Sequence, residues 1–71
     1  MNDIKTGDII YGIIYTSDEI ACVNPETVIK IDKDTIETDD DIYTISDFGT
    51  RVFKTEEIAK TKVEILNTLK K

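Results

Sequence analysis

The hydrophobic pattern of residues 7–15, GDIIYGIIY, predicts a β-strand, because β-branched and aromatic side chains dominate the segment. Alternate side chains of a strand point to opposite faces. One face carries four apolar side chains: Ile9, Tyr11, Ile13 and Tyr15. Ile10 and Ile14 lie on the other face, with Gly12 between them at an expected bend or bulge. A strand that is apolar on both faces needs cover on both, from the C-terminal helix, another strand layer or a partner chain.

Turn residues divide the following segment into short apolar runs. We expect five further strands, at residues 19–24, 27–32, 35–39, 42–46 and 50–53. Turns are predicted between them at 16–18, 24–26, 33–34, 40–41 and 47–49. Pro25 favours the turn at 24–26, because proline fixes its own φ and has no N–H. In the strand at 27–32, Ile29 and Ile31 are expected to point inward.

Residues 55–70 have the pattern of an amphipathic helix. Thr55 suits the N-cap position, and Glu56 and Glu57 lie in the first turn, where negative charge is favourable. The apolar positions share one broad helical face: Ile58, Ala59, Val63, Ile65, Leu66 and Leu69. Lys62 falls near the middle of that face. Its ammonium group either reaches past the edge of the packing, or it marks a surface that meets a partner.

The whole chain, residues 1–71, is expected to form one domain, with a β-rich body at 1–54 and a C-terminal helix at 55–70. Short strands with regular turns are typical of small barrels. We therefore expect a mainly β fold, a small antiparallel SH3-like barrel or a strongly bent sheet, with the helix packed on it. The single cysteine, the lack of a membrane-length apolar run and the absence of a signal-peptide pattern predict a soluble, cytoplasmic protein.

The charge is distributed unevenly within a net value of −6. Residues 1–50 contain twelve Asp/Glu and three Lys, whereas residues 51–71 contain six Lys/Arg and three Glu. An acidic body is thus joined to a basic tail. The body is expected to repel phosphate backbones, which makes direct nucleic-acid binding by it unfavourable.

The most acidic stretch is residues 31–45, IDKDTIETDDDIYTI, with six carboxylates and one lysine. Asp32 and Asp34 occupy positions 1 and 3 of an EF-hand-like loop. However, Glu37 replaces the glycine required at position 6, and Tyr43 replaces the glutamate required at position 12. We therefore expect no specific calcium site and no metal or cofactor.

Two interpretations of this stretch remain open. In the first it is a solvated hairpin, whose core positions are Ile29, Ile31, Ile36, Tyr43 and Ile45. Acidic turns of this kind also discourage edge-to-edge aggregation. In the second interpretation its carboxylates bind a basic partner through complementary fields. The candidate binding residues are then Asp32, Asp34, Glu37, Asp39, Asp40 and Asp41.

The sequence contains few candidate catalytic residues. There is no histidine to activate Cys22, which lies mid-strand and is expected to be a buried structural thiol. Residues 47–49, DFG, match a kinase metal-binding triplet, but the other kinase motifs are absent, and the triplet is interpreted as a turn. We expect a protein that is not an enzyme.

From Tyr43 onward, the sequence resembles the end of small uncharacterised proteins of phages and other mobile elements of low-GC bacteria. In these, a short β-rich body meets a final helix at a junction of the type VF-x-T-x-EE, which corresponds here to Val52, Phe53, Thr55, Glu56 and Glu57. Residues 5–12, KTGDIIYG, also resemble the first strand of SH3-like barrels. The resemblance implies a fold type and a genetic context in which small acidic proteins inhibit host defence nucleases, as anti-CRISPR and anti-restriction proteins do.

These patterns lead to three functional expectations. The first is a non-enzymatic protein-interaction module, in its most specific form an inhibitor that occupies the basic nucleic-acid-binding groove of a host defence protein. The second is a self-associating accessory protein, a homodimer formed through the two-faced strand or the helix. The third is a nucleic-acid contact through the basic side chains of the tail: Lys54, Lys60, Lys62, Lys70 and Lys71.

Overall fold

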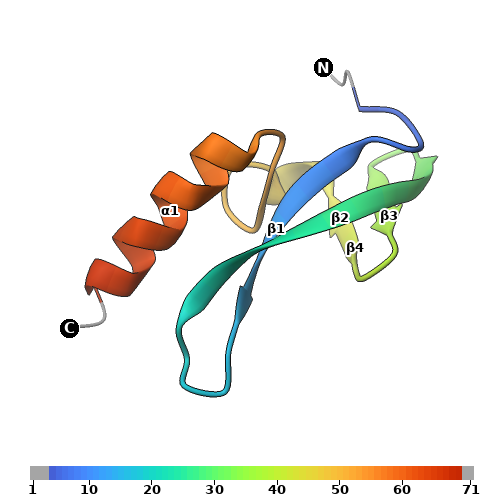
Figure 1. Cartoon of the computed structure of the whole chain (residues 1–71). Coiled ribbons are helices and arrows are strands. Elements are labelled where there is room, and N and C mark those ends of the chain that lie inside the picture. The colour runs from blue at the N-terminus through green and yellow to red at the C-terminus, as the bar shows by residue number, and fades with distance from the viewer. Residues whose placement is uncertain (1–3, 70–71) are drawn as a thin grey trace.

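The computed structural model describes residues 4–69, which form a five-stranded antiparallel sheet followed by one helix. The strands are β1 (Ile9–Tyr15), β2 (Ala21–Asp32), β3 (Thr35–Thr38), β4 (Ile42–Thr44) and β5 (Val52–Phe53). A short 3₁₀ helix, η1 (Ile45–Asp47), follows β4, and α1 (Glu56–Leu69) ends the described chain. The strand order is β4-β3-β2-β1-β5, and the sheet curls into a half-barrel (Figure 1). The predicted fold class, mainly β with a strongly bent antiparallel sheet and one C-terminal helix, is confirmed.

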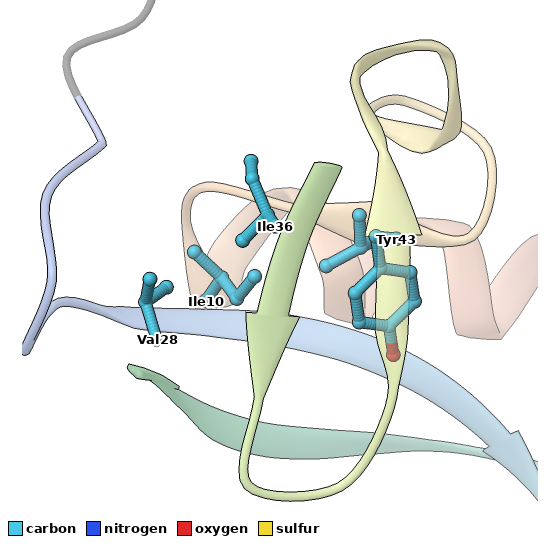
Figure 2. Close-up of a cluster of buried hydrophobic side chains, with 5 residues drawn as sticks. Ile10, Val28, Ile36 and Tyr43 are labelled. Carbon is cyan, nitrogen blue, oxygen red and sulfur yellow. The ribbon is translucent and has the colours of Figure 1, made fainter. Parts of the chain in front are cut away.

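The two apolar faces of β1 are covered by different layers. Inside the curl, five buried side chains, one from each strand, form the core: Ile10, Val28, Ile36, Tyr43 and Val52 (Figure 2). On the other face, α1 lies against β1, β2 and β5, and Ala21, Phe53 and Ala59 are buried outside the core cluster. The curled sheet therefore covers one face of β1 and the C-terminal helix the other, but the cover is partial, since Ile9, Ile14 and Tyr15 are 45%, 46% and 55% exposed.

Both ends of α1 are fixed by hydrogen bonds. Thr55 is the N-cap, as predicted, because its Oγ1 accepts the N–H of Ile58 at 3.4 Å and its carbonyl accepts the N–H of Ala59 at 3.2 Å. Near the other end, the Asn67 side chain accepts the N–H of Ala21 at 2.8 Å and donates to its carbonyl at 3.1 Å. This pair of bonds ties the helix to the first residue of β2. Within residues 4–69, no helix is long and apolar enough to cross a membrane.

The predicted turn at residues 24–26 is wrong, because β2 runs without a break through Pro25, which lies opposite Tyr11. The N–H of Val28 donates to the carbonyl of Asp8 at 2.9 Å. Alternate residues of β2 therefore direct their N–H groups toward β1, and Pro25 has the opposite parity. Its missing N–H faces the side where β3 has not yet begun to pair, since β3 pairs with β2 only from Val28 onward.

The prediction that Ile29 and Ile31 are core positions is wrong, because both side chains are exposed. The inward face of β2 is set by Glu26 and Val28, which are 1% exposed, so Ile29 points outward and is 49% exposed. A register shift between Val28 and Lys30 then places Ile31 opposite Ile36. Ile31 lies one residue from the end of β2 and is 41% exposed.

The last two strands are shorter than predicted. In place of a strand over 42–46, β4 ends at Thr44 and the chain enters η1, whose residue Asp47 accepts the N–H of Thr44 at 2.9 Å. In place of a strand over 50–53, β5 contains Val52 and Phe53 alone. The predicted turn at 47–49 is present, and Gly49 adopts a φ of 93° that favours glycine.

Candidate functional site

The six predicted binding residues lie along the hairpin of β3 and its two flanking turns. Asp32 and Asp34 flank Lys33 at the β2–β3 turn, and residues 39–41 form the β3–β4 turn. Glu37 lies between them on β3, opposite Lys30. The five aspartates are exposed and Glu37 is half-buried. A four-residue strand is about 13 Å long. The carboxylates therefore form a band along one hairpin rather than one compact cluster.

The segment Asp39, Asp40 and Asp41, which we name the acidic turn, is held in place by its own carboxylates. Each accepts a hydrogen bond: Asp39 from the N–H of Thr27 at 3.1 Å, Asp40 from the Asn24 side chain at 2.9 Å, and Asp41 from the N–H of Ile42 at 2.8 Å. The Thr38 hydroxyl oxygen also accepts the N–H groups of Asp40 and Asp41, at 3.1 and 2.9 Å. Three consecutive negative charges are thus exposed on a backbone whose conformation is fixed.

Beneath the acidic turn lies a buried carboxylate, Glu26, which is 1% exposed. Its Oε1 accepts the Thr38 hydroxyl at 2.6 Å. Its Oε2 accepts the Tyr43 hydroxyl at 2.8 Å and the Asn24 amide at 3.1 Å. Three neutral donors therefore satisfy the buried carboxylate, as a buried polar group requires. Because Thr38 and Asn24 also bond the acidic turn, the Glu26 network anchors that turn to the sheet.

Space for this network comes from Gly12. In β1, Gly12 lies opposite Asn24, and the pairing of β1 with β2 runs from Ile9 to Tyr15 without a register shift. The pairing therefore contains no bulge at Gly12, one of the two alternatives expected there. A Cβ atom at this position would lie less than 3.0 Å from both Glu26 Oε2 and the Tyr43 hydroxyl. Glycine is needed here for a close approach of side chains and not for an unusual φ.

The sequence prediction missed Glu26, Asn24 and Thr38. A signal was present, because residues 24, 26 and 28 alternate onto one face of an extended chain and Val28 belongs to the core. The turn assigned to Pro25 concealed this periodicity. Cys22, expected to be buried, is half-buried in β2.

A groove of about 400 Å³ lies beside the Glu26 network. Its lining combines carboxylates with apolar and aromatic side chains: Ile13, Ile14, Asn24, Glu26, Asp40, Asp41 and Tyr43. Such a lining suits a lysine or arginine side chain, whose methylene groups can contact isoleucine while the charged end meets a carboxylate.

Arg51 shows how a guanidinium group meets this surface within the chain itself. It lies 3.3 Å from Asp41 Oδ2 and 3.4 Å from Asp47 Oδ2, and its guanidinium carbon is 5.1 Å from the centre of the Tyr43 ring. Both ion pairs are partly exposed and contribute little to stability. The side chain nevertheless covers only one edge of the acidic turn, since no ion pair is found for Asp39 or Asp40 among the described residues.

The geometry supports neither a metal site, which the sequence did not predict, nor a basic patch on the tail. Among residues 4–69, no three His, Cys, Asp or Glu side chains are placed to hold a metal ion. Of the described tail lysines, Lys60 and Lys62 do not lie together, since Lys60 pairs with Glu56 at 3.7 Å and Lys62 is half-buried on a different side of α1. Lys70 and Lys71 lie outside the described residues.

Burial raises the pKa of the Tyr43 hydroxyl above its ordinary value of 10.0, and the hydrogen bond and negative charge of Glu26 raise it further. Because the pKa of Tyr43 is higher in the folded protein than in the unfolded chain, the protonated hydroxyl stabilises the fold. This stabilisation is complete below pH 10 and is lost as the pH rises above it. We expect Tyr43→Phe to lower the free energy of unfolding by about 1–2 kcal/mol at pH 8. The difference from wild type should shrink by up to ~1.4 kcal/mol per pH unit above pH 10. Urea unfolding at pH 8, 10 and 11 measures this difference, and a constant difference would contradict the assignment.

The acidic turn, the Glu26 network beneath it and the adjoining groove form the candidate binding site. Its exposed part is charged and its buried part is fully hydrogen-bonded. Comparison of the chain with protein-family models, with curated proteins and with solved structures found no match.

Proposed function

We propose that this chain is a non-enzymatic protein-interaction module that binds a basic protein surface through the acidic turn. The observation that supports the proposal is the arrangement of Asp39, Asp40 and Asp41, three adjacent exposed carboxylates on a backbone held by the Glu26 network. Binding to a pre-ordered turn costs little conformational entropy. Asp32, Asp34 and Glu37 extend the negative field along the hairpin and should accelerate association with a positively charged partner.

In its more specific form, the proposal concerns a partner that normally binds nucleic acid. A groove lined by lysine and arginine for phosphate recognition presents the charge that this hairpin complements. The chain would then inhibit its partner by occupying that groove. The resemblance of the last third of the chain to phage and mobile-element proteins makes a host defence protein the first class of partner to test.

The test compares wild type with a triple variant, Asp39→Asn, Asp40→Asn and Asp41→Asn. Asparagine retains a side-chain oxygen that can accept each hydrogen bond of the turn, so the variant should remove charge with little change of fold. We expect a bacterial partner captured by wild type at low salt to be captured at least tenfold less by the variant, and both to lose capture at high salt.

A matched control removes three exposed carboxylates elsewhere, with Asp8→Asn, Asp18→Asn and Glu19→Gln. This control has the same net charge as the triple variant. It should capture the partner as well as wild type does. Equal capture by all three proteins would show that the acidic turn is not the binding surface. Equal loss of capture by both variants would show that binding depends on the net charge of the protein and not on the acidic turn.

A further inference from the structure

The sheet covers only half of the apolar face of α1. Ala59 is fully buried against the sheet, whereas Ile58, Ile65 and Leu69 are 56%, 50% and 75% exposed. Successive residues of a helix are about 100° apart, so these three fall within about 40° of one another, at positions i, i+7 and i+11. We name them the exposed stripe. It lies roughly 100° around the helix from the buried side.

The exposed stripe borders a groove of about 480 Å³ at the start of the helix. Gly49, from the turn before β5, and Phe53, from β5, form one wall, and Ile58, Thr61 and Ile65 form the helix side. Four turns of a surface helix normally bury such residues. An apolar groove continued by an apolar stripe is typical of a surface that packs against another helix.

Charged residues flank the exposed stripe with opposite signs. Glu57 and Glu64 lie on one side of it, and Lys62 lies on the other. If a second copy packed antiparallel, the two glutamate sides would face each other. If it packed parallel, the glutamate side of each helix would face the lysine side of the other, and Glu57 would lie beside the partner's Lys62, five positions along, in two symmetric pairs.

We propose that the exposed stripe is the interface of a parallel, two-fold homodimer of this chain, with Ile58 and Ile65 at its centre and reciprocal ion pairs between Glu57 and the partner's Lys62. Ile58 and Ile65 lie seven residues apart, as the β-branched residues at the central position of two-stranded coiled coils do, and Thr61 and Thr68 stand where such helices usually carry leucine. The charges therefore set the parallel orientation. The interface is short, so the dimer should be weak and dependent on protein concentration.

The dimer goes beyond the proposed function and uses a different surface. Figure 1 places α1 and the β3–β4 hairpin on opposite sides of the molecule. A dimer through α1 therefore leaves both acidic turns accessible and makes the module bivalent. Bivalency strengthens binding to a partner that presents two basic sites without adding a new contact.

Sedimentation equilibrium of the full chain at low salt tests the proposal over a wide range of protein concentration. Wild type should approach twice the mass of one chain. Glu57→Lys and Lys62→Glu should each weaken association about tenfold, because each places like charges together, and the double variant should restore it. Ile65→Asp should abolish association while the circular dichroism spectrum remains that of wild type.

The control is Lys60→Glu with Glu56→Lys, which exchanges an ion pair made within one helix at 3.7 Å and should leave association unchanged. A mass equal to one chain at all concentrations would show that the dimer does not form, even if another protein binds the exposed stripe. If Glu57→Lys associated more strongly than wild type, the helices would be antiparallel, because the new lysine would then face the glutamate side of the partner helix. The triple asparagine variant of the acidic turn should dimerise normally, so the failure of one proposal is distinguishable from the failure of the other.

Discussion

Gly12→Ala is expected to lower the free energy of unfolding by about 2–4 kcal/mol, through one added methyl group. The new Cβ would lie less than 3.0 Å from Glu26 Oε2 and from the Tyr43 hydroxyl. Neither group can move away cheaply, because both are buried and bonded to each other at 2.8 Å. A domain of this length has a total stability of only ~4–10 kcal/mol, so much of the variant would be unfolded under mild conditions.

A double-mutant cycle tests whether the clash with the Tyr43 hydroxyl causes this loss of stability. Urea unfolding at pH 7, followed by circular dichroism, gives the free energy for wild type, Gly12→Ala, Tyr43→Phe and the double variant. Removal of the Tyr43 hydroxyl takes away one of the two obstacles to the new Cβ. The double variant should therefore be more stable than the sum of the single effects predicts. Strict additivity would show that Gly12 acts through backbone conformation instead.

The elements predicted well from the sequence are those whose pattern is local and repeated. β1 has seven alternating positions with apolar residues on both faces, and α1 has an N-cap, an acidic first turn and a helical apolar period. Each signal lies within one segment of the chain. For the same reason, composition alone predicts the turn at 33–34, and its turn at 40–41 is one residue away from the bend at Asp39–Asp40.

The elements predicted wrongly depend on neighbours that are distant in sequence. Pro25 is tolerated in β2 because no strand pairs on the side that its backbone nitrogen faces. That side is unpaired because β3 begins to pair with β2 only at Val28. The burial of Glu26 depends on Thr38 and Tyr43, which are 12 and 17 residues away. The local sequence pattern of residues 24–26 does not indicate that Glu26, Thr38 and Tyr43 come together next to Gly12 of β1. The positions of the five aspartates at exposed turns could be predicted, but the network that orders three of them could not.

Glu26→Ala is expected to be the most destabilising of the changes considered, with a loss of about 3–5 kcal/mol. The substitution removes the acceptor of three donors, and it leaves the Tyr43 and Thr38 hydroxyl groups buried without that partner. Glu26→Gln should cost less, about 1–3 kcal/mol, because an amide oxygen can accept from one hydroxyl group while its NH₂ cannot accept from the other. The control is Glu37→Ala in the same hairpin, which is half-buried and should cost below about 1 kcal/mol.

Replacement of the whole network separates its contribution to stability from its contribution to binding. A buried polar group and its partners can often be exchanged together for apolar residues of similar volume at little cost. The triple variant Glu26→Leu, Thr38→Val and Tyr43→Phe should therefore recover most of the stability that Glu26→Ala loses. It should not recover partner binding, because Thr38 Oγ1 also accepts the N–H groups of Asp40 and Asp41 and orders the acidic turn. Recovery of both properties would show that the turn binds without being held in one conformation, and recovery of neither would show that the fold itself depends on the buried carboxylate.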